Sequence, residues 1–341
     1  MDIVKRFSTL TQKLYAKTWG KYLLLFITIY VMYFFLSLSL YVANDKGATI
    51  RTLMLIAHFA LFFYGYKLYQ KKSLTYDKII MLLFISGFIL RLGYGTYTYV
   101  YTRQHDLGRD EFDVGHVGYI ANIFYYFKLP DSNAYQFYHP PLHHIVSAIF
   151  MRVNEFIFQI KDFTTILSTV KILTIFYSSA ILITIYEILK ELKLPKKVII
   201  FAFAICAVHP TFIILSPSIN NDIMSIMFMF FALLYTIRWY KNPSYLNIIL
   251  IALSIGLGMM TKLSAGIIAP VTAIIFLIRW IKSYKENKFF SMVPQFILFA
   301  LICLPLALIY PIRNYLLFDQ SFTYVFKVTN PALYTGDRSI W

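Results

Sequence analysis

The sequence predicts an all-α protein that crosses a membrane several times, as a polytopic transmembrane helical bundle. Of its 341 residues, 59% are hydrophobic and 19% are aromatic, and the mean hydropathy is +0.64. This apolar surface is larger than one water-soluble core can bury. Residues 20–42 carry almost no charge, and they are long enough to cross a hydrocarbon core, which needs about 20 apolar residues. Spanning helices follow from these observations.

Nine apolar segments are long enough to cross the membrane. They are residues 20–42, 50–66, 79–101, 165–186, 198–215, 221–237, 245–260, 263–278 and 290–312. A tenth segment, 140–158, is ambiguous because His143, His144, Arg152 and Glu155 interrupt its apolar residues. We therefore predict about nine spans and treat the tenth segment separately.

The distribution of Lys and Arg decides how 140–158 is placed, because these residues accumulate in cytoplasmic loops. If 140–158 returns to the side it came from, nineteen Lys and Arg are cytoplasmic and eleven are outside. If it crosses, fifteen lie on each side and the bias disappears. We therefore expect a juxtamembrane or re-entrant helix at 140–158, a cytoplasmic amino terminus and an exterior loop at 102–164.

The net charge of +16 is explained by these cytoplasmic loops, so we expect the lipid bilayer and not nucleic acid as the partner of the basic residues. Cys206 and Cys303 both fall inside predicted spans, where cysteine behaves as a small apolar residue. They do not predict a disulfide or a metal pair.

The exterior loop gathers most of the side chains that are capable of chemistry. Its segment from Arg103 to His144 holds five of the seven histidines and five carboxylates, which are Asp106, Asp110, Glu111, Asp113 and Asp131. A carboxylate here could act as the general base for an attacking hydroxyl group. The candidates are Asp106 and Asp113, with Glu111 beside them. The alternative for any single carboxylate is simple solvation, since exterior loops are polar.

Residues 115–127 have apolar residues at helical spacing, which predicts an amphipathic helix at the membrane interface. His116 on this helix and His139 after it are candidates for binding an anionic leaving group. His139 and His143 are four residues apart and could hold zinc together with His116. No HExxH-type motif fixes such spacing, so phosphate binding or helix packing is preferred. A divalent metal stays an open alternative, and no cofactor is assigned.

Polar residues also stand at the predicted outer ends of later spans. Asn221 and Asp222, in SPSINNDIM, are either helix caps or groups that orient a substrate. Lys262, in MMTKLS, and Arg313, in YPIRNYLLF, are placed outside against the charge bias. A lipid phosphate would explain both, and the alternative is snorkelling to lipid headgroups.

Arg91 lies well inside a predicted span, where a cation is expensive unless it faces a cavity or a partner. This residue is the main support for a rival interpretation, a lipid or solute transporter. A third interpretation is a non-catalytic membrane assembly factor for surface glycans.

The sequence resembles bacterial membrane glycosyltransferases of the GT-C superfamily, and within it the family 39, protein-mannosyltransferase-like enzymes. The resemblance is carried by an acidic exterior loop after an early span, followed by the strings GHVGYI, FYHPPLHH, NND, TKLS and PIRNYLLF. It covers about residues 78–320, which we take as the core of a single membrane domain at 1–341. Residues 1–77 add an amino-terminal tail and two accessory spans. The exterior tail at 321–341 ends soon after the last span, which suggests a fragment or a short member.

The resemblance implies a polyprenyl-phosphate-linked sugar as donor, a catalytic aspartate in the first large exterior loop, and inversion at the sugar carbon. Carried over to this sequence, the base is Asp106, in the pair HD, or Asp113, which follows the pair DE.

We therefore predict an inverting glycosyltransferase of the bacterial plasma membrane with an exterior active site. It would move the sugar to a hydroxyl group of an acceptor glycan, lipid or protein. His116, His139, Lys262 and Arg313 would bind the phosphate as it leaves.

Overall fold

The computed structural model of the protein describes residues 19–41, 45–101, 106–108, 110–132, 136–285 and 289–320. All regular elements in these ranges are helices and none is a strand, which confirms the predicted all-α class. The basic tail with Lys5 and Arg6, His105 of the HD pair and the carboxyl-terminal tail at 321–341 lie outside the described residues.

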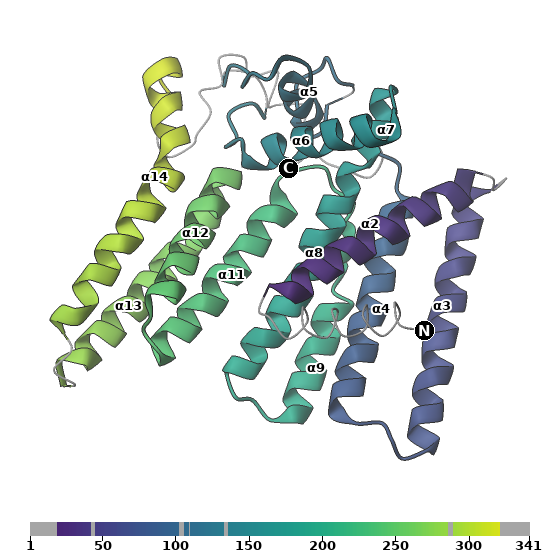
Figure 1. The fold of residues 1–341 in the computed structure, drawn as a ribbon, viewed down its shortest axis with the longest axis horizontal. Coiled ribbons are helices and arrows are strands. Elements are labelled where there is room, and N and C mark those ends of the chain that lie inside the picture. Colours follow the sequence, from purple (N-terminus) through teal and green to yellow (C-terminus); the bar gives the residue numbers. More distant parts are fainter. Residues whose placement is uncertain are drawn as a thin grey trace, which may run out of the picture. The chain divides into compact units, whose positions relative to one another are not determined.

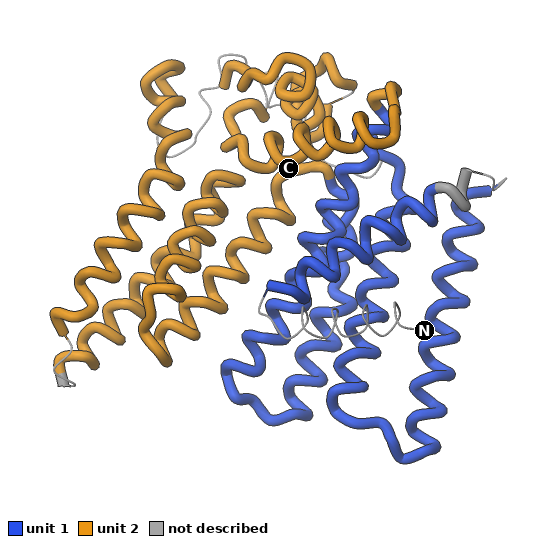
Figure 2. Tube along the Cα trace, in the orientation of Figure 1, with its two compact units in different colours: residues 1–103, 164–218 blue, residues 104–163, 219–341 orange. Residues whose placement is uncertain are grey.

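The chain forms two compact units, each built from two stretches of sequence (Figure 2). Unit 1 comprises residues 1–103 and 164–218, and unit 2 comprises residues 104–163 and 219–341. The predicted exterior loop and the later polar strings therefore belong to the same unit. The expected division into a core at 78–320 and flanking segments stays a prediction.

Unit 1 is a bundle in which α4 packs against α3, α8 and α9, and α2 packs against α8 (Figure 1). Its helices are α2 (Gly20–Tyr41), α3 (Lys46–Gln70), α4 (Tyr76–Tyr97), α8 (Val170–Glu191), α9 (Lys196–Ala207) and α10 (Pro210–Ile214). A short helix, α7 (Phe163–Ser168), precedes α8. Most of α8 is buried, whereas the sides of α3 are exposed and apolar, as expected for a helix that faces lipid.

Two buried cations in unit 1 form hydrogen bonds to neighbouring helices. Arg91 on α4 is fully buried; its Nε donates to Ser178 Oγ at 2.9 Å, and its Nη1 donates to the carbonyls of Gly87 and Ala207, each at 2.8 Å. Lys171 Nζ donates to the carbonyl of Thr98 at 2.7 Å. These bonds join α4 to α8 and to the end of α9, so Arg91 has protein partners, as an intramembrane cation requires. Its Nη2 is buried without a hydrogen-bond partner among the described residues.

Unit 2 holds the remaining helices, with α12 packed between α11 and α14. They are α5 (His116–Tyr126), α6 (Leu142–Phe158), α11 (Asp222–Lys241), α12 (Tyr245–Thr261), α13 (Ile268–Lys285) and α14 (Val293–Phe318), with the 3₁₀ helices η1 (Leu263–Ile267) and η2 (Phe290–Met292). The helices α5 and α6 also pack against each other.

Within the described ranges, seven helical segments are long and apolar enough to cross a membrane. The count of about nine is therefore not confirmed, and two predicted spans account for the difference. The segment at 198–215 is divided at Pro210, because α9 ends at Ala207 and a residue that precedes proline is driven out of the helical conformation. The segment at 245–260 forms α12, which is apolar but has only 17 residues.

The ambiguous segment at 140–158 forms α6, which is not one of the seven candidate spans. One side of α6 is buried, while Ile149, Val153 and Phe156 on the other side are exposed. The charged side chains in this apolar segment have partners, as the contacts of Arg152 show. Its Nε and Nη2 donate to the carbonyl of Phe124 near the end of α5, and its Nη1 bonds Glu155 at 2.8 Å. The arrangement fits a juxtamembrane helix, and its side of the membrane stays a prediction.

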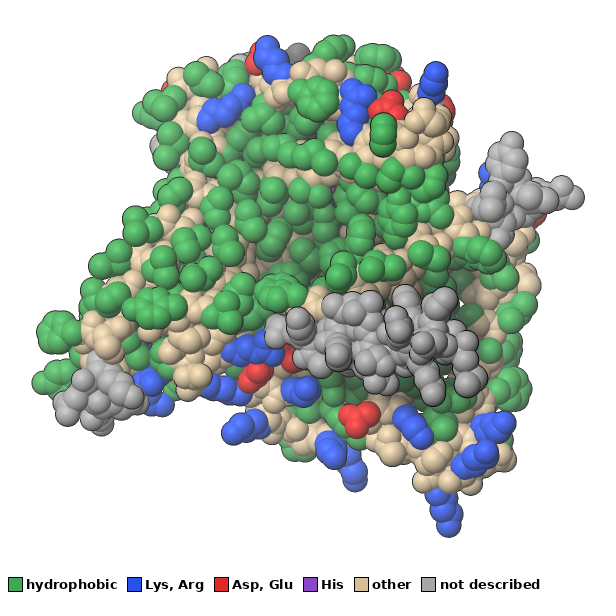
Figure 3. All heavy atoms as spheres, viewed as in Figure 1, with side chains coloured by type: hydrophobic (Ala, Val, Ile, Leu, Met, Phe, Trp, Pro, Cys, Tyr) green, Lys and Arg blue, Asp and Glu red, His purple; other side chains and the backbone are tan. Residues whose placement is uncertain are grey.

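The surface of unit 1 shows the same division between apolar sides and charged ends. Hydrophobic side chains cover the helix sides, and Lys and Arg side chains gather at the lower edge of the unit in Figure 3, where the turns between α3 and α4 and between α8 and α9 lie (Figure 1). The sequence places Lys71, Lys72, Lys193 and Lys196 in or beside these turns. This edge is the one that the charge bias predicts to be cytoplasmic.

We expect Arg91→Met to destabilise the protein, because the carbonyl of Ala207 and the hydroxyl of Ser178 would each lose a buried donor. The expected loss is about 1–3 kcal/mol for each buried group left unpaired. Unfolding in detergent measures it, with Arg51→Met on the exposed side of α3 as the control. Equal effects of the two substitutions would contradict the structural role of Arg91.

Candidate active site

The amino-terminal end of α5 is held by the acidic loop that precedes it. The amide of His116 donates to the carbonyl of Asp106 and the amide of Val117 to that of Leu107, each at 2.9 Å. These bonds satisfy amides in the first turn of the helix, which have no partner inside it. Gly115 makes the turn possible, because its φ of +121° is strained for any residue with a side chain.

The three candidate carboxylates lie in this loop. Asp106 is exposed and has a left-handed backbone, with φ of +62°. Asp113 is half-buried, and its Oδ1 accepts the amide of Val114 at 2.8 Å. Glu111 is half-buried in the turn between them. Through its backbone bond to His116, Asp106 is joined directly to the histidine-bearing helix.

Four buried histidines, His116, His139, His143 and His144, come together behind this loop and form what we call the histidine cluster. His116 Nδ1 and His144 Nε2 are 2.9 Å apart and share a hydrogen bond. The ring of His116 stacks on His139 at 5.3 Å, and the ring of His144 stacks on Tyr119 at 4.0 Å, between centroids. The bond between His116 and His144 requires at least one neutral ring, because two imidazolium ions would repel each other and neither could accept a hydrogen bond.

Burial lowers the pKa of every histidine in the cluster. It lowers the pKa of His139 to about 3, with Lys262 adding to the effect, and that of His143 to about 4. The pKa values of His116 and His144 fall well below the usual range, first through burial and then through the neighbouring histidines. The cluster is therefore neutral near pH 7 and offers hydrogen bonds without positive charge.

His143 joins the cluster to the string SPSINNDIM, which leads into α11. Its Nε2 lies 3.1 Å from the carbonyl of Ile219 and must donate, because a carbonyl can only accept. Its Nδ1 is then an acceptor, and it is buried with no hydrogen-bond partner among the described residues. The Oδ1 of Asn221 is in the same situation. Both atoms therefore have an unused capacity to accept a hydrogen bond.

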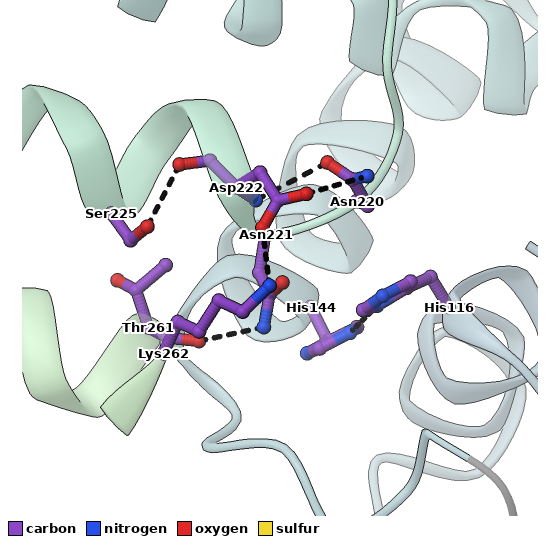
Figure 4. Close-up of polar contacts among 8 residues, drawn as sticks. All are labelled: His116, His144, Asn220, Asn221, Asp222, Ser225, Thr261 and Lys262. Carbon is purple, nitrogen blue, oxygen red and sulfur yellow. Dashed lines mark hydrogen bonds and ion pairs between the residues drawn. The ribbon is translucent and has the colours of Figure 1, made fainter. Parts of the chain in front are cut away.

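The start of α11 and the end of α12 meet beside the cluster (Figure 4). Asn221 Nδ2 donates to the carbonyl of Thr261 at 2.9 Å, and Lys262 Nζ forms an ion pair with Asp222 Oδ1. The other oxygen of Asp222 accepts Asn220 Nδ2 at 3.1 Å. The side chains of Lys262 and Asp222 are 28% and 31% exposed, so solvent or a ligand can reach this ion pair.

The last turns of α14 hold the other end of the loop. Tyr310 donates to the carbonyl of Phe137 at 3.0 Å, and Tyr119 is 2.9 Å from Tyr310 and donates to it. Arg313 Nη1 donates to Ser132 Oγ at 3.2 Å and to its neighbour Asn314 at 3.0 Å. The helix bends on its way to this contact (Figure 1), as expected from Pro305 and Pro311 within it. Arg313 therefore has a structural role, and phosphate binding by it stays a prediction.

The structure thus brings together most of the residues singled out from the sequence. Those around the histidine cluster and the ion pair are His116, His139, Asn221, Asp222 and Lys262. The sequence-based argument missed His144 and Tyr119, whose contacts depend on the packing of α5 against α6. The strings GHVGYI and FYHPPLHH contain both residues but do not predict their pairing.

The described residues contain no group of three or more His, Cys, Asp or Glu side chains arranged to hold a metal ion. Within the cluster, His116 and His144 bond each other and His143 bonds a carbonyl. These contacts engage one nitrogen of each of the three rings in bonds within the protein.

The model of the dolichyl-phosphate-mannose-protein mannosyltransferase family matches residues 138–312, about half of the chain. The chain belongs to this family. It is therefore a membrane glycosyltransferase of the GT-C type, as the resemblance implied. No curated protein and no solved structure matches the chain. The matched region includes His139, Asn221, Asp222 and Lys262, whereas the acidic loop precedes it.

The low histidine pKa values predict a loss of stability in acid. Since the folded pKa values of His139 and His143 lie below the unfolded value of about 6.5, the unfolded chain binds more protons as the pH falls. The stability is complete above pH 6.5 and is lost toward about pH 4, by about 1.4 kcal/mol per pH unit for each proton. The free energy of unfolding is measured across this pH range. In His139→Gln its slope against pH should be smaller by the contribution of about one proton.

The control for this experiment is His209→Gln, which replaces an exposed histidine of unit 1. A pH profile that is the same in His139→Gln and in the unchanged protein would show that the cluster does not titrate as the structure implies.

Proposed function

We propose that the protein is an inverting glycosyltransferase that moves a sugar from a polyprenyl-phosphate donor to an acceptor hydroxyl group on the exterior face of the bacterial plasma membrane. The observation that supports this most strongly is the junction in unit 2. There, the loop that carries the acidic residues is bonded to the helix of His116, and the histidine cluster lies close enough to Lys262 for its charge to lower the pKa of His116 and His139. A base and a cation for an anionic leaving group are thus available in one unit.

In this reaction the oxygen of the acceptor hydroxyl forms a bond to the anomeric carbon, and the bond from that carbon to the phosphate oxygen breaks. The hydroxyl proton passes to the carboxylate of Asp106, with Asp113 as the alternative base and Glu111 third. Both electrons of the broken bond leave with the polyprenyl phosphate. The side of attack is opposite to the leaving group, so the configuration at the sugar carbon is inverted.

Lys262 would meet the charge that develops on the phosphate. Its partner Asp222 remains held by Asn220 and by the amino-terminal end of α11, where a negative charge is favourable. The neutral histidines and Asn221 would contribute hydrogen bonds to the donor. The lowered pKa values of His116 and His139 make these rings weak bases, so they compete little with the general base for the proton.

We expect Asp106→Asn to lower sugar transfer by about 10²- to 10⁴-fold, the usual contribution of a general base. Asp113→Asn and Glu111→Gln are compared with it, and the largest loss identifies the base. Transfer is measured in purified membranes with a panel of polyprenyl-phosphate-linked sugars. The control is Asp110→Asn, which keeps the side-chain oxygen that accepts the amide of Phe112.

If none of the three substitutions lowers transfer while the unchanged protein is active, the assignment of the base to this loop is wrong. If the unchanged protein consumes no polyprenyl-phosphate-linked sugar, the proposed donor class is wrong.

We expect Lys262→Gln to lower kcat by about 10²- to 10³-fold, as for other groups that stabilise developing negative charge. Asp222→Asn should have a smaller effect, since it keeps an oxygen and a short side chain at the start of α11. Steady-state transfer kinetics measure both, with Lys128→Gln in the exposed part of the loop as the matched control. An unchanged kcat in Lys262→Gln would contradict a role in leaving-group stabilisation.

A further inference from the structure

Unit 1 contains a cavity of about 680 Å³ that has no part in the proposed reaction. Side chains from α2, α3, α4, α8 and α9 line it, and most of them are aliphatic or aromatic. The volume lies within the range of about 300–1,000 Å³ that is typical of small-molecule sites. The cavity therefore has room for a ligand with a largely apolar surface.

The charged residues of the lining are confined to one end of the cavity. Lys21 is the second residue of α2, Asp77 is the second residue of α4, and Glu187 lies near the end of α8. Lys21 Nζ and Glu187 Oε1 form an ion pair at 2.6 Å, which ties α2 to α8 there. At this end, which the charge bias predicts to be cytoplasmic, a polar headgroup would find both a cation and carboxylates.

The length of the cavity corresponds to one leaflet of a bilayer. Along α4 its lining runs from Asp77 to Ile89, and along α2 from Lys21 to Met32. At a rise of about 1.5 Å per residue, the stretch of α4 is about 18 Å long. The hydrocarbon core of a bilayer is about 30 Å thick, so one leaflet contributes about 15 Å. A ligand with its polar end beside Lys21 would reach the middle of the membrane.

An apolar cavity of this size is unfavourable for water, which needs several polar partners. Left empty, it would deprive its lining of dispersion contacts. Its helices α2, α3, α4 and α8 are all candidate spans, so the surrounding medium supplies lipid chains in great excess. We propose that this cavity binds one acyl chain of a membrane phospholipid, with the phosphate of that lipid beside Lys21.

The experiment measures the phospholipid that the full chain retains. The protein is purified in a mild detergent, and bound lipid is counted by native mass spectrometry and identified after extraction. We expect a diacyl phospholipid on the unchanged protein. In Ala57→Trp, whose indole would fill the cavity from α3, most of that lipid should be lost. The matched control is Ala60→Trp on the same helix, at an exposed position outside the lining, which should retain it.

A second measurement distinguishes lost binding from poor folding. Adding phospholipid to delipidated protein should raise the unfolding temperature of the unchanged chain and of Ala60→Trp, because a ligand that binds only the folded state stabilises it. It should not raise that of Ala57→Trp. Lys21→Gln should weaken retention while leaving the cavity open.

Two results would overturn the proposal. One is equal phospholipid retention by Ala57→Trp and Ala60→Trp, which would mean that the lipid lies elsewhere on the surface. The other is retention of a polyprenyl phosphate in place of a diacyl lipid, which would assign the cavity to an isoprenoid chain. Neither result bears on the proposed transfer reaction, whose residues lie in unit 2.

Discussion

The hydrocarbon core of the membrane is the constraint on which the rest of this structure depends. In that medium a polar group has no water to bond, so the backbone must form helices and each polar side chain must find a partner or reach a helix end. Arg91 and Lys171 show the first solution, with donors directed at backbone carbonyls and Ser178. Asp222 and Lys262 show the second, since one begins α11 and the other follows α12.

The same constraint explains how residues far apart in the sequence form one site. Polar residues excluded from the middle of the spans accumulate where the helices end, and in unit 2 those ends meet α5 and α6. Once there, they are held by bonds of specific geometry, such as that between Asn221 and the carbonyl of Thr261. At the end of α14, Tyr310 holds the loop in the same way by donating to the carbonyl of Phe137. The ends of the spans are thus where polar residues can lie, and local hydrogen bonds fix the positions of their side chains.

Apolar length and the residues typical of helix ends can be recognised in the sequence, which is why the all-α class and the positions of Asp222 and Lys262 beside helix ends could be predicted. The number of spans could not, because it depends on where helices stop, as at Pro210, and on whether 17 residues such as those of α12 suffice. The hydrogen bond between His116 and His144 could not be predicted either. It joins residues 28 positions apart through the packing of α5 on α6, and no local pattern encodes that contact. For Arg313 the sequence suggested a lipid phosphate or snorkelling to headgroups, and the bonds of its side chain to Ser132 and Asn314 could not be predicted.

The contrast among the cations shows which of them is suited to chemistry. Arg91 is fully buried and donates to three groups, so withdrawing it toward a ligand would leave buried acceptors unpaired, at a high cost. Lys262 differs, since its ion pair with Asp222 is partly exposed and such pairs contribute only about 0–1 kcal/mol. This weaker hold supports the proposal that Lys262 can be shared with an arriving phosphate. Asp222 would not be left alone, because Asn220 and the start of α11 continue to hold its charge. A cation that is held weakly, beside an anion that is held well, is the arrangement expected where a charged leaving group must bind and then depart.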